Sequence, residues 1–316
     1  MFYNGMKRRI LSVISMLLGI VFAQAQTCLP GGITFNSQAD VDSFQSDYPG
    51  CVEIEGQVII SGGFPLELDG LIVLEKIHGA LNVFADRLHD FTGLENLNYI
   101  GGDLRILKAD SLFFCSGLEQ LQEVGGNLSF GENDLLESLD GLASLKLVQG
   151  DFILNKNPEL SNLIGLDSLE SIDGNVRVIG NIGLKSLDGL QSLHSIVVDL
   201  IVEDNYVLNN IQTLEAVSEI GGELSIIDNF KLSSIGGLRS LNTVGGSLLL
   251  HSNPQLKSLD PLHMLSTVGE DFVITSLSSI MNLDSLTELT HVGGSIIITA
   301  NNSLLSLHGL SNLVSI

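Results

Sequence analysis

The sequence predicts an all-β fold: a parallel β-helix, or solenoid, of about eleven rungs of 23–24 residues, behind a short N-terminal helical cap. One observation is a recurring phrase of Leu, Gly and Ser, as in "SLDGLQSLHSI", "SIGGLRSLNTV" and "SLHGLSNLVSI". A second is the spacing of the apolar residues within each unit, which follows a strand and then a tight coil. A fixed period is the signature of a solenoid, whose rungs bury their apolar faces only against their neighbours.

The period is set by an apolar residue that precedes the pattern x-Gly-x-Leu-x-Ile, and we count positions in each unit from this residue as 0. These residues are Ile54, Ile77, Ile100, Val124, Val148, Ile172, Ile196, Ile220, Val244, Val268, Val292 and Ile316. The first two intervals are 23 residues and the other nine are 24. Such regularity over 262 residues identifies one repeated structural unit.

Within a unit, positions 0, +4 and +6 are β-branched or Leu, which predicts one short strand with a buried face. Apolar residues then come at +12, +15, +18 and +21, as in the run from Leu184 to Leu193. Spacing of three predicts a coil or 3₁₀-like return path and not an amphipathic α-helix. With almost no aromatic residues in these columns, the core is expected to be aliphatic.

Polar columns accompany the apolar ones. Position +9 is Asn in seven units, and stacked amides are expected to bond along the column and to turn backbone. Position +14 is Ser or Asn in every unit from Ser138 to Ser306, and eight units carry Gly near +17, including Gly189, Gly237 and Gly309, where a positive φ would turn the chain. Val198 and Glu270 replace Gly at +2, so we expect this position to lie at a corner open to solvent.

The N-terminus reads as a secretory signal peptide over residues 1–26, with basic Lys7, Arg8 and Arg9, an apolar run and small residues at Ala23 and Ala25. The alternative is a retained membrane anchor, but the run is shorter than the ~20 residues that a span needs. Removal of three basic residues and no acidic one changes the net charge from −23 to −26. Nucleic acid and anionic membranes are therefore not expected partners, and no membrane span is expected after cleavage.

Two further segments are expected in the mature chain: a cap over 27–52 and the solenoid over 53–316. The sequence ends at Ile316, a position 0 with no strand after it, so we expect the C-terminus to be truncated. A sorting or anchoring segment could follow.

The unit "LIGLDSLESIDGNVRVIGNIGL" (Leu163 to Leu184) resembles the repeat of receptor L domains, the leucine-rich β-helical modules of insulin-receptor and EGF-receptor relatives, which also occur in bacterial secreted proteins. The resemblance covers about Cys28 to Ile316, and the inserted "I-x-G" before the strand separates it from the ordinary leucine-rich repeat. It implies an N-terminal helix held by a disulfide, here Cys28–Cys51, which also brackets the predicted cap. It further implies ligand contact through the strand sheet.

Catalytic and metal sites are not predicted. Position +3 alternates carboxylates such as Asp103 and Asp151 with neutral acceptors, and we expect an outward, solvated stripe rather than a Ca²⁺ site. The seven His residues fall in different columns, so no metal and no cofactor is expected. Cys115 occupies a Leu position at +15 and should be a buried, inert thiol.

Position +5 goes beyond what folding requires, because it should face solvent and yet is mostly aliphatic. The candidate ligand-binding residues in this column are Arg105, Ile153, Arg177, Ile201, Leu249, Val273 and Ile297. The alternative is that β-propensity alone selects them, or that a further domain covers them.

We therefore expect a secreted or cell-surface, non-enzymatic recognition or adhesion protein that binds an extracellular protein or glycan through its strand face. A self-associating structural protein of the envelope is the first alternative, and a polysaccharide-active β-helix enzyme is the second.

Overall fold

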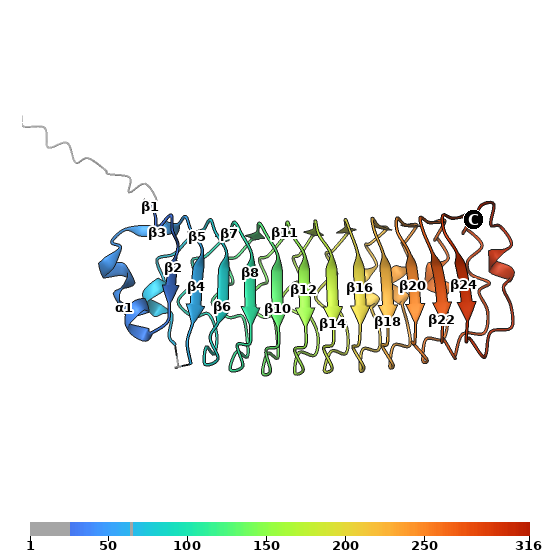
Figure 1. Cartoon of the computed structure of the whole chain (residues 1–316), viewed down its shortest axis with the longest axis horizontal. Helices are drawn as coiled ribbons and strands as arrows, with labels where there is room; N and C mark the ends of the chain where they lie inside the picture. Colours follow the sequence, from blue (N-terminus) through green and yellow to red (C-terminus); the bar gives the residue numbers. More distant parts are fainter. Residues whose placement is uncertain (1–25, 64–65) are drawn as a thin grey trace, which may run out of the picture.

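The computed structural model describes residues 26–63 and 66–316 and shows the predicted solenoid of about eleven turns (Figure 1). The predicted signal peptide lies outside the described residues except for Gln26. Every turn contributes one strand to each of two parallel sheets, each of twelve strands. Consecutive turns are hydrogen-bonded neighbours in both sheets, so sequence order and spatial order coincide.

We call the two sheets the narrow sheet and the wide sheet. The narrow sheet, whose strands mostly have two residues, contains β1 (Gln26–Cys28), β3 (Cys51–Ile54), β5 (Lys76–Ile77), β7 (Tyr99–Ile100), β9 (Glu123–Val124), β11 (Leu147–Val148), β13 (Ser171–Ile172), β15 (Ser195–Ile196), β17 (Glu219–Ile220), β19 (Thr243–Val244), β21 (Thr267–Val268) and β23 (His291–Val292). The wide sheet, whose strands mostly have four, contains β2 (Ile33–Phe35), β4 (Val58–Ser61), β6 (Leu81–Phe84), β8 (Leu104–Leu107), β10 (Leu128–Gly131), β12 (Phe152–Asn155), β14 (Val176–Ile179), β16 (Leu200–Glu203), β18 (Leu224–Ile227), β20 (Leu248–His251), β22 (Phe272–Thr275) and β24 (Ile296–Thr299).

The prediction of one strand from position 0 to +6 is wrong, because the chain bends between +1 and +3 and divides it into two strands on different sheets. The bend requires a close approach of consecutive rungs. A Cβ atom on Gly245, at +1, would lie 2.1 Å from the carbonyl oxygen of Gly221 in the previous rung. The corner expected at +2 is confirmed, since Val198 and Glu270 are exposed there.

The core is mostly aliphatic, as predicted, although six phenylalanines are also fully buried. The four leucines from Leu184 to Leu193 at +12, +15, +18 and +21 are each 0% exposed, and the same columns are buried in the neighbouring rungs. Positions 0, +4 and +6 of the two sheets close the core from the other sides, as Ile220, Leu224 and Ile226 show. Each rung thus buries its apolar side chains against those directly above and below it.

The return path is the tight coil that the spacing of three predicts. Within the part of the chain that the structure describes, it contains 3₁₀ turns in five places: η1 (Asp69–Leu71), η2 (Gln212–Leu214), η3 (Gly236–Leu238), η4 (Asp260–Leu262) and η5 (His308–Leu310). The +14 side chains hold its start, because each accepts the backbone N–H two residues later, as Ser258 Oγ does from Asp260 at 2.9 Å.

The conformation predicted for the glycines near +17 holds in only part of the chain. Gly189 has the expected positive φ of 120°. Gly237 and Gly309 do not have a positive φ and lie instead within η3 and η5. Glycine is still required at Gly237 for space, since a Cβ atom there would lie 1.9 Å from the carbonyl oxygen of Ile211.

The predicted asparagine ladder is confirmed. Asn181 is 0% exposed, and its Oδ1 accepts the backbone N–H of Asn157 at 2.9 Å. Its Nδ2 donates to the carbonyl oxygens of Leu154 at 3.0 Å and of Ile179 at 3.2 Å. Equivalent bonds recur at the other buried positions, Asn133, Asn157, Asn205, Asn229 and Asn253. The ladder therefore satisfies backbone groups that the turn after the wide sheet leaves unpaired.

That turn passes through a left-handed residue at +8, which the sequence did not reveal. The φ angle is between 52° and 57° at Lys108, Glu132, Lys156, Asp204, Asp228, Ser252, Ser276 and Ala300, and 69° at Gly180. The next residue is usually the ladder Asn, whose Nδ2 reaches back across the left-handed residue to the carbonyl of +7, as from Asn229 to Ile227 at 2.9 Å. The side chain thus fixes a conformation that is unfavourable for most residues.

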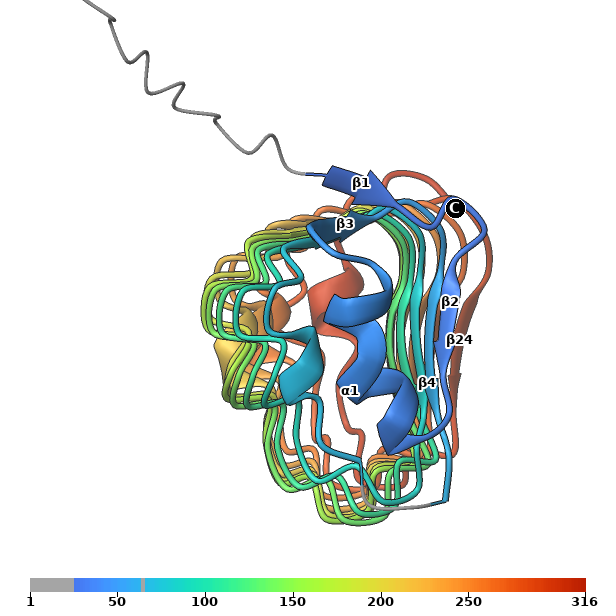
Figure 2. The same cartoon turned by 90° about the vertical axis from the view of Figure 1, so that its left-hand side faces the viewer.

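Helix α1 (Gln38–Asp47) lies across the N-terminal end of the solenoid, where Figure 2 shows it over the interior of the coils. Ser37 is its N-cap and accepts the backbone N–H of Asp40, and Val41 and Phe44 are buried. The predicted disulfide Cys28–Cys51 is present and joins β1 to β3. Strand β1 belongs to the narrow sheet and β2 to the wide sheet. Both sheets therefore continue from the solenoid into the capping segment.

Candidate functional site

The candidate site is the outer face of the wide sheet. In each four-residue strand, +4 and +6 point into the core, so +5 and +7 point outward. The seven residues predicted for this site all lie in the +5 column, and parallel pairing places those from adjacent rungs side by side. The structure therefore brings the candidates onto one face, as the repeat register predicts.

Two serines divide the column. Ser129 follows Arg105, and Ser225 follows Ile201, and both are almost fully buried beneath their neighbours. The first cluster that remains is Ile153, Arg177 and Ile201 on adjacent strands. The second is Leu249, Val273 and Ile297, also on adjacent strands.

The C-terminal cluster is the apolar one. Leu249 and Val273 are half-buried by their neighbours, while Ile297 is 41% exposed. None of its three members is ionisable, and the preceding residue of the +5 column is the neutral Ser225. The cluster is a continuous aliphatic strip across β20, β22 and β24.

The arginines of the column are in different environments. Arg105 forms an ion pair with Asp103 of its own rung. Arg177 lies between Ile153 and Ile201, and its Nε is buried without a hydrogen-bond partner. Packing of the methylene stem of Arg177 between its neighbours leaves Nε without a hydrogen bond, which costs free energy because a buried donor is unpaired.

The +7 column shares this outer face but is not among the residues predicted from the sequence. It runs through Ile179, Glu203, Ile227, His251 and Thr275 beside the +5 column. Polar groups here are organised: Glu203 Oε1 accepts from Ser225 Oγ at 3.2 Å, and His251 Nδ1 contacts Thr275 Oγ1 at 2.5 Å. The alternation that predicts an outward side chain at +5 predicts the same at +7, because residues two apart in a strand point to the same face of the sheet.

The acidic +3 column is not the solvated stripe that the sequence suggested. These side chains are half-buried at the corner before the wide sheet, and the four aspartates among them each accept the backbone N–H of +3 in the next rung, whereas Glu223 does not. Asp103 Oδ1 accepts from Asn127 at 2.7 Å, and Asp271 Oδ1 from Ser295 at 2.6 Å. The alternation of Asp, Asn and Ser reflects this shared acceptor role, since all three can accept such a bond.

This second ladder runs opposite to the asparagine ladder. At +3 the side chain accepts from the following rung, whereas at +9 it accepts from the preceding rung. Burial, followed by the charge of Asp199, raises the pKa of Glu223 in the +3 column.

An exposed aromatic pair lies outside the predicted site. Tyr206 and Phe230, at +10, are 44% and 45% exposed, and their rings stack with centroids 5.3 Å apart. Ile182 precedes them in the same column and is also exposed. The signal was present in the sequence, because "NIGL", "NYVL" and "NFKL" each place an apolar residue directly after the ladder Asn.

Other reactive groups are dispersed or buried. Cys115 is 0% exposed and unpaired, and burial raises the pKa of its thiol, as expected for an inert core residue. Within residues 26–63 and 66–316, no group of three His, Cys, Asp or Glu side chains is placed to hold a metal ion. In the same residues, no helix has the length and apolar character needed to cross a bilayer.

Comparison with protein-family models and with curated proteins adds no relative to this picture. No protein-family model matches the chain, and no curated protein is significantly similar to it. The structure establishes the chain as a parallel β-solenoid repeat protein with one disulfide.

Proposed function

We propose that this protein is a secreted or cell-surface recognition protein without enzymatic activity, which binds an extracellular protein or glycan through the outer face of its wide sheet. The observation that carries the proposal is the strip formed by Leu249, Val273 and Ile297, three aliphatic residues paired side by side on the outer face. A contiguous apolar surface with polar surroundings is the usual composition of an interface.

The polar surroundings are the +7 column and the corner at +3. His251, Thr275 and Thr299 lie on the same strands as the three aliphatic residues and offer donors and acceptors at the border of the strip. Asp271 lies at the corner of the same sheet. This arrangement is that of an apolar centre with a hydrogen-bonding border.

Export of the protein is part of the proposal. Cys28–Cys51 is a disulfide of the kind that persists in oxidising compartments, which agrees with the predicted secretory signal. The repeat and the disulfide-linked helical cap also support the resemblance to receptor L domains, and that resemblance favours the strand face as the ligand surface.

The experiment replaces Val273 and Ile297 together by Ser. Both side chains point away from the core, so the double variant should keep its circular dichroism spectrum and its melting temperature within a few degrees. Binding to a partner isolated by pull-down, or to a glycan found on an array, should be lost. The matched control is Val197→Ser with Val198→Ser, which removes two exposed valines from a corner on another side of the rung.

Three results would contradict the proposal. Retention of binding by the double variant would place the interface elsewhere. A mass by light scattering that rises with concentration in the wild type and not in the double variant would identify the strip as a self-association surface. Release of reducing ends from acidic polysaccharides would identify an enzyme.

A further inference from the structure

The narrow sheet carries a hollow of about 420 Å³ on its outer surface, near the N-terminal end and away from the strip on the wide sheet. The side chains that line it belong to Lys76, His78, Asn98, Tyr99, Gln122 and Glu123. This volume is in the range of small-molecule sites. Nothing in the core packing or in the two ladders requires these six residue types.

Tyr99 is at the centre of the hollow. It lies in β7, and parallel pairing places Lys76 on one side of it and Glu123 on the other, all three pointing outward. His78 approaches the Tyr99 ring with the ring centroids 6.1 Å apart and the planes inclined at 60°. The amides of Asn98 and Gln122 precede Tyr99 and Glu123 in the chain and complete the wall.

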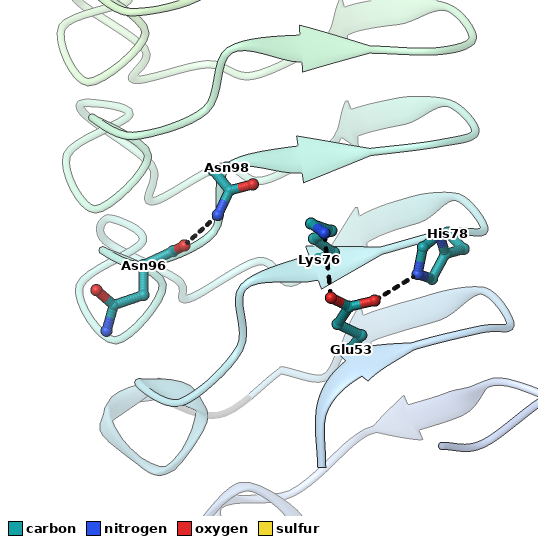
Figure 3. Close-up of polar contacts among 5 residues, drawn as sticks. All are labelled: Glu53, Lys76, His78, Asn96 and Asn98. Atoms are coloured by element: carbon teal, nitrogen blue, oxygen red, sulfur yellow. Dashed lines mark hydrogen bonds and ion pairs between the residues drawn. The ribbon is translucent and has the colours of Figure 1, made fainter. Parts of the chain in front are cut away.

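Most of the wall is already held in place. Figure 3 shows Lys76 and His78 converging on Glu53, with Lys76 Nζ 3.1 Å from Oε1 and His78 Nε2 2.9 Å from Oε2. The same view shows Asn98 Nδ2 directed at the carbonyl oxygen of Asn96, at 3.2 Å, so its Oδ1 remains for another donor. Glu123 Oε1 accepts from Gln149 at 2.6 Å.

Such ordering matters because a ligand would not have to immobilise these side chains itself. The Gln122 side chain is exposed and adds an amide donor and acceptor beside the ordered ones.

The charges around the hollow select against ionic ligands. The two basic side chains share one nearly buried carboxylate, because Glu53 is 9% exposed and bonds to both. Hydrogen bonds from His78 and then from Lys76 lower the pKa of Glu53, so this carboxylate stays ionised and engaged. Glu123 places a negative charge on the opposite wall, which repels an anion. No basic group is left unshared for an anion, and the carboxylates do not converge on a cation.

We infer that this hollow, centred on Tyr99, is a binding site for a short neutral saccharide. An aromatic ring packs against the C–H face of a sugar, and planar amides both donate to and accept from adjacent hydroxyls. The site is separate from the strip of Leu249, Val273 and Ile297, so it does not depend on the function proposed for that strip.

The test measures binding of maltotriose, cellotriose, mannotriose and tri-N-acetylchitotriose by saturation-transfer NMR and calorimetry, with trigalacturonate as the anionic comparison. At least one neutral trisaccharide should bind with a millimolar or lower Kd. Tyr99→Ala should weaken that binding about tenfold or more, the loss of one aromatic contact of about 1.4 kcal/mol. Gln122→Ala, at an exposed position, should weaken saccharide binding severalfold. This variant tests the site independently if Tyr99→Ala does not fold.

Two controls accompany these variants. Tyr206→Ala removes an exposed tyrosine from another edge of the solenoid and should leave the saccharide Kd unchanged. The Val273→Ser, Ile297→Ser protein should also bind the saccharide normally, which separates this site from the wide sheet. The inference is overturned if no neutral trisaccharide binds at millimolar concentration. It is equally overturned if trigalacturonate binds more tightly than every neutral one, or if Tyr99→Ala and Gln122→Ala both bind as the wild type does.

Discussion

Asn205 accepts the backbone N–H of Asn181 through its side-chain oxygen at 3.0 Å, exactly one rung earlier in the chain. Both residues are fully buried, so this bond joins adjacent turns of the solenoid inside the protein, where water cannot replace it.

Replacement of one ladder residue should therefore destabilise the protein. Asn181→Ala removes the acceptor of the Asn157 N–H and the donor to the Leu154 carbonyl, leaving both buried and unpaired. We expect the free energy of unfolding to fall by about 1–3 kcal/mol, measured by urea denaturation. Asn302→Ala is the matched control, because Asn302 is exposed one position after a ladder residue, and it should be nearly neutral. Equal losses in both variants would show that burial in the ladder is not the cause.

Steric space should decide the effect of alanine at the glycines. Gly237→Ala places a methyl group against the Ile211 carbonyl oxygen, at 1.9 Å before relaxation, so we expect a loss of about 2–3 kcal/mol. Gly63→Ala, where no atom lies within 4 Å of the new Cβ, should change the stability little. Thermal unfolding of both variants measures the difference, and a neutral Gly237→Ala would mean that the coils can separate without cost.

The three cysteines should differ in behaviour. Cys28→Ser with Cys51→Ser should lower the stability by about 2–4 kcal/mol, since the bridge restrains the unfolded chain across 23 residues. Cys115 should not react with a thiol reagent in the native protein and should react fully in denaturant, because it is buried. Peptide mapping without reduction gives the pairing, and any link to Cys115 would contradict it.

Glu223 should make stability depend on pH. Its pKa in the folded protein lies above the ordinary 4.5, so the folded state favours the protonated form and loses stability as pH rises through that raised pKa. Glu223→Gln should therefore be more stable than the wild type at pH 7, by less than about 1 kcal/mol, and the gain should vanish below the ordinary pKa. Glu219→Gln, on the exposed face of the same rung, serves as the control. A gain that persists in acid would have another origin.

The fold was predictable because each structural position of the rung recurs many times in the sequence, once in every repeat unit. The buried leucines and the asparagine ladder follow from residue type and spacing, and the disulfide follows from the resemblance and from the two cysteines that bracket the cap. The outward +5 column was also correctly placed, so Leu249, Val273 and Ile297 do lie on one face. What the column binds stays a prediction.

Features set by backbone geometry were not predictable in the same way. The left-handed residue at +8 is Lys, Glu, Ser or Ala in six rungs, and none of these types signals a positive φ, whereas Gly180 does and Asp204 and Asp228 do so only weakly. At +3, an Asp looks the same in the sequence whether its carboxylate is solvated on a surface strand or accepts a backbone N–H from the next rung. The hollow around Tyr99 depends on neighbours from three rungs, which single columns do not reveal.

The one-rung register of the two ladders also determines how this protein can change its length. An interior rung such as 173–196 forms the same ladder bonds with the rung before it and with the rung after it. Those two rungs could form the same bonds directly with each other. Excision of those 24 residues would join Ile172 to Val197 with every bond re-formed, whereas removal of a partial rung would break both ladders. Duplication or loss of whole rungs can therefore shift the separation of the surfaces on the two sheets in steps of about 4.8 Å without a new core.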